Sequence, residues 1–564
     1  MADLVIRNAT IVDGTGTAAF AGDIVIDGSV ITSVEPAGTA PKAKREIDAT
    51  GQLVTPGWVD VHTHYDGQVT WDPEVTPSSW HGATTVVMGN CGVGFAPARR
   101  GTEEQALLIE LMESVEDIPG TALHEGINWQ WESFPEYLDA LDAMPRVLDV
   151  AAQVPHAALR AYVMGDRAHD DDATNEDVAM MAKLSAEAIE SGAVGFSTSR
   201  TVLHRSKYGL VPGTTAPGEE VVAICEAIGK TGKGVIQIIS DRSGHDGPER
   251  QWMVDIARNT GRPVTFLTAQ TPFSPEGYRD VLDHAQALQE EGVQFVPQVG
   301  NRPTGMLFGL QSSFHPFITH PTYKAMRDLP LSERVVELRR PEVRDALLAE
   351  EGKAMSPLMT RWDHMFQLGD PPDYEPPREA SVAATAEREG RRPEEVALDW
   401  LLERDGKALF FAPLASYVHH NFDAIREMVS HPSTVLGLSD GGAHCGLICD
   451  ASMTTFNLTH WARDRTRGEK LPLEYVVQQQ TQRTAQLYGF TDRGEIKPGK
   501  RADINVIDFD NLRIHAPEMI FDLPAGGRRL VQYVDGYTAT ICAGQVTFEN
   551  GEATGARPGR LVRA

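Results

Sequence analysis

The stretch Pro56-Gly57-Trp58-Val59-Asp60-Val61-His62-Thr63-His64-Tyr65-Asp66 carries the main structural signal of this chain. An apolar run follows a Pro-Gly turn and ends in polar residues, which is typical of a buried strand. Residues two apart on a strand point the same way, so His62 and His64 present two imidazoles to one side of the strand's C-terminal end. A zinc-type ion can bridge such a pair. Taken alone, a His-x-His pair on a strand is more often a polar surface pair.

Two later apolar runs end in further candidate ligands. Residues 84–88 lead to Gly89-Asn90-Cys91, and residues 434–438 lead to Ser439-Asp440-Gly441-Gly442. A thiolate is a strong zinc ligand, and a carboxylate can bind a metal with one oxygen while the other takes a proton from metal-bound water. Asp440 is therefore a candidate both as a ligand and as a general base. On their own, a cysteine that ends a strand is often inert core and Ser-Asp-Gly-Gly is often a plain turn.

The composition is that of an ordinary globular protein with a strongly acidic surface. Hydrophobic residues make up 41% of the 564 residues, charged residues make up 23%, and the formal net charge is −28. Such a charge repels phosphate backbones and anionic lipids, so we expect no nucleic acid and no membrane as partners. The N-terminal residues lack a signal-peptide pattern, and no apolar run reaches about 18 residues. The five cysteines are scattered, which favours a cytoplasmic protein without a disulfide framework.

The order of predicted elements separates the chain ends from the middle. Short β-branched runs occur at 4–8, 11–14 and 23–28 and return only at 502–508 and 537–544, which suggests one small sheet domain built from both termini. Between them, apolar runs alternate with amphipathic helical stretches. One of these, 173–191, opens with a near-capping pattern of Thr174 and Asp177. The alternation predicts a parallel sheet covered by helices, either open or closed into a barrel.

The segment from about residue 301 to 399 interrupts this alternation. It is rich in proline and charge and is longer than a normal connecting loop. Two interpretations stand side by side: a solvated surface insertion, or a lid that covers substrate on the active-site side of the sheet.

Together the motifs resemble the amidohydrolase superfamily and, within it, the N-acyl-D-amino-acid deacylase (D-aminoacylase) branch. Besides the three strand ends, the similarity rests on Gly195-Phe196-Ser197-Thr198, Val211-Pro212-Gly213-Thr214, Ile11-Val12-Asp13-Gly14 and Gly494-Glu495-Ile496-Lys497-Pro498-Gly499-Lys500-Arg501-Ala502-Asp503. The resemblance implies a (β/α)8 TIM-type barrel over residues 56–489 and a small β-sandwich split between residues 1–55 and 490–564. It also implies zinc held by His62, His64, Cys91 and Asp440, with Asp440 as the general base.

The sequence departs from the family pattern at the fifth and sixth strands. The family usually supplies one histidine from each of these strands to a second or more tightly bound zinc. Here the runs read Gly234-Val235-Ile236-Gln237-Ile238-Ile239-Ser240-Asp241-Arg242 and Val264-Thr265-Phe266-Leu267-Thr268-Ala269-Gln270, without a histidine. His245 follows five residues after Ser240, too far to substitute without a rearranged loop. We therefore expect one zinc, or two with unequal occupancy; alternatively, Ser240 or Asp241 and Gln270 form a polar substrate pocket.

Several side chains near strand ends are candidates for substrate binding. Tyr208 adjoins the Val-Pro-Gly-Thr loop, where the family places a phenolic hydroxyl against substrate. His444 lies four residues beyond Asp440, where it can assist proton transfer. The remaining candidates, which offer a hydroxyl or a bidentate partner for a carboxylate, are Ser240, Arg242, Arg200 and Arg205.

The predicted function is zinc-dependent hydrolysis of a linear amide bond in a small molecule, most simply an N-acyl amino acid. A second candidate is ring opening of a cyclic amide or imide, as in hydantoinases and dihydroorotases. Those enzymes usually bridge two metals with a carbamylated lysine, and the strand ends here offer no lysine at the fitting places. A third candidate is a non-catalytic barrel that acts as a scaffold or binding protein. The sequence leaves open the acyl group, the stereochemistry and whether the chain forms a homo-oligomer.

Overall fold

A curled parallel sheet lies at the centre of the molecule. The computed structural model describes residues 1–564 apart from 102, 170, 242–246, 351–359 and 438. Eight parallel strands follow one another in the order β18-β14-β13-β12-β9-β8-β7-β6. Their bounds are β6 Trp58–Asp60, β7 Ala83–Met88, β8 Asp149–Pro155, β9 Gly195–Arg200, β12 Val235–Ser240, β13 Val264–Leu267, β14 Phe295–Val299 and β18 Val435–Leu436.

The curl of this sheet follows from contacts between strands that are far apart in its order. One buried cluster contains apolar residues from most of the strands, together with residues in and directly after helix α17 (Gln482–Leu487). Its members include Val59, Val87, Ala151, Val194, Val235, Val435, Leu487, Tyr488 and Phe490. The segments that follow the two edge strands also meet, because Thr63 bridges Gly441 and the Asp440 N–H donates to the His62 carbonyl at 3.0 Å. The predicted strand–helix alternation thus forms a TIM-like parallel sheet.

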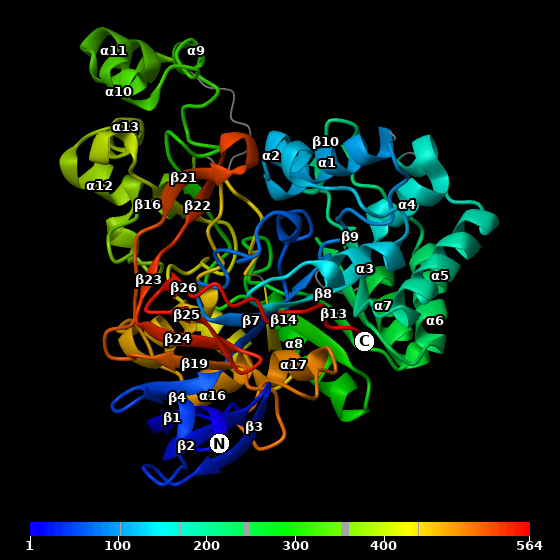
Figure 1. Ribbon diagram of the computed structural model, residues 1–564. Helices are drawn as coiled ribbons and strands as arrows, with labels where there is room; N and C mark the ends of the chain where they lie inside the picture. Colours follow the sequence, from blue (N-terminus) through cyan, green and yellow to red (C-terminus); the bar gives the residue numbers. More distant parts are fainter. Residues whose placement is uncertain (102, 170, 242–246, 351–359, 438) are drawn as a thin grey trace.

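Helices cover the outside of the central sheet (Figure 1). Those on the connections between β7 and β14 are α1 Glu103–Glu116, α2 Gly120–Gly126, α3 Phe134–Ala143, α4 His156–Met164, α5 Asn175–Glu190, α6 Gly218–Lys230, α7 Pro248–Thr260 and α8 Gly277–Glu290. Helix α5 confirms the helix predicted over 173–191. Thr174 is its N-cap, and the Thr174 and Asp177 side chains each accept a hydrogen bond from the other's backbone N–H. None of the described helices is both long and apolar enough to cross a membrane.

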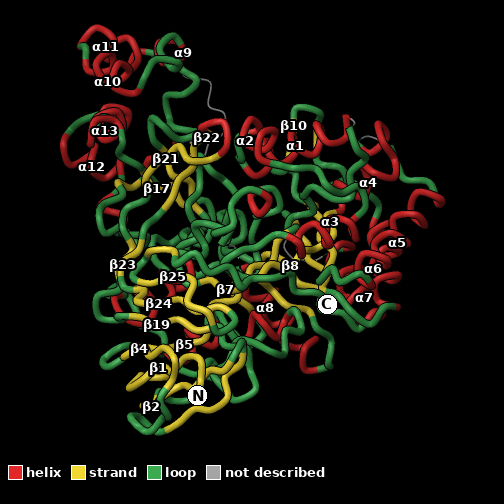
Figure 2. Tube along the Cα trace, viewed as in Figure 1, coloured by secondary structure: helices red, strands yellow, loops and turns green. Residues whose placement is uncertain are grey.

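A second sheet combines strands from both ends of the chain, as predicted. Nine strands take part, in the order β26-β25-β24-β19-β5-β1-β2-β3, with β4 beside β1. Figure 2 shows its strands together with the N-terminus at the lower left. Their bounds are β1 Ala2–Ile11, β2 Phe20–Asp27, β3 Val30–Glu35, β4 Ala43–Asp48, β5 Leu53–Pro56, β19 Ile504–Ile507, β24 Tyr537–Cys542, β25 Gln545–Glu549 and β26 Glu552–Ala553.

The first predicted strands need a correction. Residues 4–8 and 11–14 were expected as two strands joined by a tight link, but a single strand, β1 (Ala2–Ile11), continues through 4–8 and ends at Ile11, and residues 12–14 are not part of a strand. The pairing of β1 with β2 shifts register between Ile6 and Ala9, and Asn8 has φ +57° there, so the strand continues past a local irregularity. A two-layer sandwich and the boundaries at 55 and 490 remain predictions.

A buried ion-pair network joins the central sheet to the terminal sheet. Asp149, at the start of β8, is fully buried and lies 2.8 Å from Arg493 Nη1 and 2.8 Å from Arg501 Nη2. Arg501 also pairs with Asp503, which precedes β19. The predicted Gly494–Asp503 motif therefore provides charged contacts that connect the two sheets.

The segment 301–399 contains regular structure and a small core of its own. Strands β15 (Gly305–Phe308) and β16 (Phe366–Gln367) pair with β17 (Phe410–Pro413), which follows the segment. A separate apolar cluster packs its helices together, and in Figure 1 they lie away from the central sheet. The helices are α9 Pro321–Lys324, α10 Leu331–Arg339, α11 Pro341–Ala349, α12 Val382–Glu389 and α13 Pro393–Leu401.

Candidate metal centre and active site

His62 and His64 lie side by side directly after strand β6. Their side chains are 0% and 1% exposed, and their ring centroids are 5.5 Å apart. The backbone is held in extended form on both sides, because the Thr63 N–H donates to the Val87 carbonyl and the His64 N–H donates to the Gly441 carbonyl at 2.7 Å. The alternating side-chain directions of a strand therefore continue through His62 and His64, so both imidazoles point to the same side of the backbone.

Cys91 enters the site from a tight turn after β7. The residue has φ +56°, an uncommon backbone conformation for a non-glycine residue that is often found at functional sites. The next residue, Gly92, also has a positive φ, and a Cβ there would lie 2.8 Å from the Ser199 nitrogen, so glycine is required. The turn places Cys91 Sγ 3.3 Å from His62 Nε2 and 3.9 Å from His64 Nε2.

Asp440 completes the group from the other edge of the sheet. Its Oδ1 lies 3.4 Å from His62 Nε2 and 3.6 Å from His64 Nε2, and its side chain is 12% exposed. Like Cys91, Asp440 has a positive φ, of +48°. The four residues that the sequence predicted as ligands therefore converge on one point, and the ligand atoms of His62, His64 and Cys91 lie within 4.8 Å of one another.

The two imidazoles of this cluster titrate in opposite directions. Burial disfavours the charged form of His64, but Glu116, Asp440 and Cys91 outweigh burial and raise the pKa of His64 well above its usual value. Burial lowers the pKa of His62 to about 4, which keeps the imidazole neutral, as a metal ligand must be. Burial raises the pKa of the Cys91 thiol to about 12. A coordinating divalent metal reverses this last effect, because it deprotonates the thiol outright. Burial also raises the pKa of Asp440, but His64, His62 and His444 outweigh it, and the carboxyl remains ionised at neutral pH.

Three further residues of the site were missed by sequence reasoning. Gln298 on β14 accepts a hydrogen bond from His62 Nδ1 at 3.0 Å, which leaves Nε2 to face Cys91 and Asp440. Glu116, at the end of helix α1, is 1% exposed and lies 3.4 Å from His64 Nδ1 and 3.6 Å from His444 Nε2. His204, in the loop after β9, interacts electrostatically with His444 and His64, and burial lowers its pKa to about 3. Only His204 follows a strand end closely enough to have been noticed in the sequence.

A substitution at Gln298 tests whether this residue orients His62, one of the proposed zinc ligands. We expect Gln298→Ala to weaken zinc affinity about 10- to 100-fold, because a residue that fixes the tautomer and angle of a ligating imidazole typically contributes that much. Competition with a chromogenic chelator measures the change. Gln289→Ala is the matched control, since its amide donates only to the Phe295 and Ser433 carbonyls. Equal zinc affinities of the two variants would contradict the assigned role.

Polar residues that follow the fifth and sixth strands form hydrogen bonds with neighbouring loops. Gln270 accepts the Val418 N–H at its side chain and the Ser416 N–H at its carbonyl, and so it anchors the loop after β17. Asp241 accepts hydrogen bonds from Thr201 and from the Val202 N–H. The two residues proposed for a substrate pocket therefore have structural contacts elsewhere. Ser240 is 4% exposed at the end of β12.

On the fifth strand, Gln237 reaches the metal cluster. Its Oε1 accepts the Cys91 N–H at 3.0 Å, while its Nε2 is buried and donates to none of the described residues.

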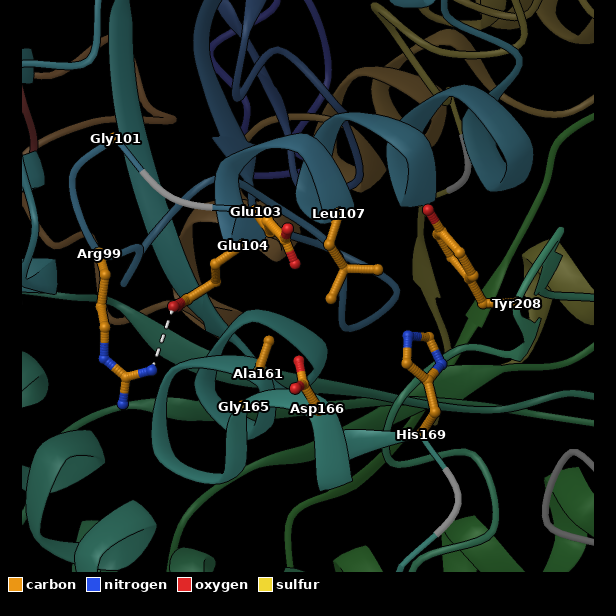
Figure 3. A pocket seen from close by; sticks show the side chains of 10 residues that line it. All are labelled: Arg99, Gly101, Glu103, Glu104, Leu107, Ala161, Gly165, Asp166, His169 and Tyr208. Atoms are coloured by element: carbon orange, nitrogen blue, oxygen red, sulfur yellow. Dashed lines mark hydrogen bonds and ion pairs between the residues drawn. The ribbon is translucent and has the colours of Figure 1, made fainter.

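The other predicted substrate residues lie in different places. His444 lies next to the cluster, paired with Glu116. Tyr208 is 55% exposed and lines a pocket of about 750 Å³ between α1 and α4, together with residues such as Leu107 and His169 (Figure 3). Arg200 donates to the Gly213 and Ala216 carbonyls, so its guanidinium stabilises the Val-Pro-Gly-Thr loop and is already hydrogen-bonded. Arg205 is exposed in β10 (Arg205–Ser206), and Arg242 and His245 lie outside the described residues.

The segment 301–399 contacts the loop that follows Asp440. The Leu307 N–H donates to the Leu447 carbonyl at 2.7 Å, and the Ser313 N–H donates to the Gly446 carbonyl at 2.8 Å. Asp117, which follows Glu116, accepts from both the Ser313 hydroxyl and the Gly446 N–H. These contacts place one end of the segment against the active-site loops, as the lid interpretation requires.

Comparisons with known proteins place this chain in a family. Residues 45–548 match the model of the amidohydrolase family, and the chain belongs to that family. It is accordingly a hydrolase of carbon–nitrogen bonds other than peptide bonds. An N-acyl-D-aspartate deacylase of Alcaligenes xylosoxydans xylosoxydans is 26% identical, with 100% of this chain and 95% of that protein aligned. Such relatives confirm the predicted resemblance to the D-aminoacylase branch.

Two solved structures share the fold over 100% of both chains, each with a TM-score of 0.66. One is a D-aminoacylase at 22% identity, described as having a binuclear metal centre with one-metal activation and second-metal attenuation. The other is an N-acyl-D-glutamate deacylase from Bordetella bronchiseptica at 24% identity, complexed with zinc and a phosphonate mimic of the tetrahedral intermediate. At these identities the likeness establishes a common fold.

Proposed function

We propose that the protein is a zinc-dependent hydrolase that cleaves the linear amide bond of an N-acyl amino acid. The observation that carries the proposal is the convergence of His62, His64, Cys91 and Asp440 at the strand ends. The deacylase relatives support the substrate class, since their names specify N-acyl-D-amino acids. The curled sheet and the shared fold support a complete (β/α)8 barrel over residues 56–489, with a β-sandwich from residues 1–55 and 490–564.

The donor set fits a zinc ion. Two imidazoles, a thiolate and a carboxylate are all common zinc ligands, and Gln298 fixes the tautomer of His62 that leaves Nε2 available. When bound, zinc lowers the pKa of water towards neutrality and polarises a carbonyl oxygen. The chain supplies four ligands at this point, so we infer one zinc, or two with unequal occupancy.

Asp440 performs the proton transfers in this proposal. Its low pKa keeps it ionised, so it can take the proton of the attacking water and then deliver it to the leaving amine. Ser439 and the His62 carbonyl fix the turn on which Asp440 lies: the Ser439 hydroxyl donates to Asp60, and the Asp440 N–H donates to His62. His204 and His444 lie close enough to interact with the reacting groups electrostatically.

The proposal also covers the compartment, the binding partner and the role of residues 301–399. Five unpaired cysteines, all buried, support a reducing compartment such as the cytoplasm. The acidic surface argues against nucleic acid and anionic membranes as partners. The lid interpretation of residues 301–399 is supported by their contacts with the loop after Asp440.

A substrate panel tests the proposed function. Zinc-loaded and chelator-treated protein are assayed on N-acetylated D- and L-amino acids and on hydantoins and dihydropyrimidines. We expect release of the free amino acid from at least one N-acyl substrate, lost on chelation and restored by zinc. Turnover of the cyclic amides alone would favour the hydantoinase-like alternative. Zinc binding without turnover of any amide would favour a non-catalytic scaffold.

A further inference from the structure

A second cluster of possible metal ligands lies apart from the active-site residues. Asp363 and His364 belong to a short 3-10 helix (Trp362–His364) between helices α11 and α12 of the insertion. His420 lies in the loop between β17 and α14 (Asp423–Ser430). One ligand atom of each residue can be chosen so that all three lie within 4.8 Å of one another.

Two imidazole nitrogens of this cluster have no hydrogen-bond partner among the described residues. His364 is 5% exposed; its Nδ1 pairs with Asp363 Oδ2 at 2.9 Å, whereas its Nε2 is buried and unbonded. Nδ1 of His420 is likewise buried and unbonded within the described part of the chain, and the two ring centroids are 4.2 Å apart. More than about 90% of buried polar groups have a partner, so two unbonded nitrogens beside a carboxylate require an explanation.

The loop that carries His420 is held from two sides before any ligand binds. Gln270 accepts the Val418 N–H at 3.1 Å, and buried Glu375 accepts the Phe422 N–H at 2.8 Å. Preorganised ligands lose little conformational entropy on binding, which favours a metal site. Arg361 and Arg378 are the cationic neighbours of His420, and the Asp363 carboxylate offsets their repulsion of a metal ion.

We propose that Asp363, His364 and His420 bind a second divalent transition metal, most simply zinc, with water in the open position. Two imidazoles and one carboxylate form a common zinc ligand set. The ion would connect the 3-10 helix Trp362–His364 of the insertion to the loop after β17, so its role would be structural rather than catalytic. Because Arg361 and Arg378 lie nearby, this site binds zinc more weakly than the four-ligand cluster.

Zinc stoichiometry tests the proposal in a protein that lacks the first site. In a His62→Ala/Cys91→Ser background, we expect titration calorimetry to find one equivalent of zinc. Adding His420→Ala removes it, whereas adding His419→Ala, at an exposed neighbouring histidine, leaves it in place. No zinc binding in the background variant, or full retention after His420→Ala, would overturn the assignment.

A chemical probe tests the same site in the unmutated chain, where misfolding of a variant plays no part. Diethyl pyrocarbonate modifies free imidazoles, and mass spectrometry reports the extent at each histidine. We expect zinc to slow modification of His420 by at least tenfold while His419 changes less than twofold. Equal behaviour of the two histidines with and without zinc contradicts binding at His420.

Discussion

Asp440→Asn is expected to lower kcat/KM for the best N-acyl amino acid by about 10²- to 10⁴-fold, the usual contribution of a positioned general base. The amide keeps an oxygen that can face the metal, but it cannot accept the proton of the attacking water. Because Asp440 Oδ1 lies within 3.6 Å of both His62 Nε2 and His64 Nε2, the change also removes negative charge from the ligand cluster. Steady-state kinetics with added zinc measures the loss.

The control for this variant is Asp328→Asn, an aspartate whose side chain is 90% exposed. It should retain the kcat/KM of the unmutated protein. Zinc content, measured on both variants, separates loss of the base from loss of the metal. Turnover by Asp440→Asn at more than about a tenth of the normal rate would rule out Asp440 as the base.

Asp149→Ala is expected to lower the free energy of unfolding by about 3–5 kcal/mol, the usual effect of removing one partner from a buried ion pair. Asp149 is fully buried and pairs with two guanidinium groups, those of Arg493 and Arg501, each at 2.8 Å. It also accepts the Arg560 N–H at 2.9 Å. Without this carboxylate, each buried guanidinium keeps only one acidic partner, Asp492 for Arg493 and Asp503 for Arg501. Urea unfolding followed by tryptophan fluorescence measures the difference.

Glu549→Ala is the matched control for that prediction. It breaks the Arg45–Glu549 pair, which has the same 2.8 Å separation but lies on the surface, with both side chains about half exposed. Such pairs contribute about 0–1 kcal/mol. If the two variants lose equal stability, the network around Asp149 does not couple the two sheets.

The convergence of the four proposed ligands could be predicted from the sequence because their positions follow a simple rule. In a parallel sheet the C-terminal ends of all strands meet at one edge, so residues that directly follow strands come together. His62, His64, Cys91 and Asp440 each follow a strand in this way. The terminal sheet was predictable for a related reason, since its β-branched runs differ plainly from the middle of the chain.

The remaining site residues depend on contacts that the sequence does not encode locally. Glu116 lies at the end of a helix and reaches His64 only because α1 packs over the site. Gln270 occupies a strand end, yet its side chain anchors the loop after β17 and does not join the metal cluster. Tyr208 adjoins a predicted active-site loop but faces a surface pocket. In each case tertiary packing decides where a polar side chain points.

The location of bound zinc tests the central claim most directly. Diffraction data collected on both sides of the zinc absorption edge, from crystals grown with zinc, show where the metal lies. We predict a strong anomalous peak bonded to His62, His64, Cys91 and Asp440, and either none or a weaker one at the C-terminal ends of β12 and β13, between Gln237 in β12 and Gln270 after β13. The account is contradicted by the absence of a peak among the four ligands, or by a second peak of equal height at those strand ends.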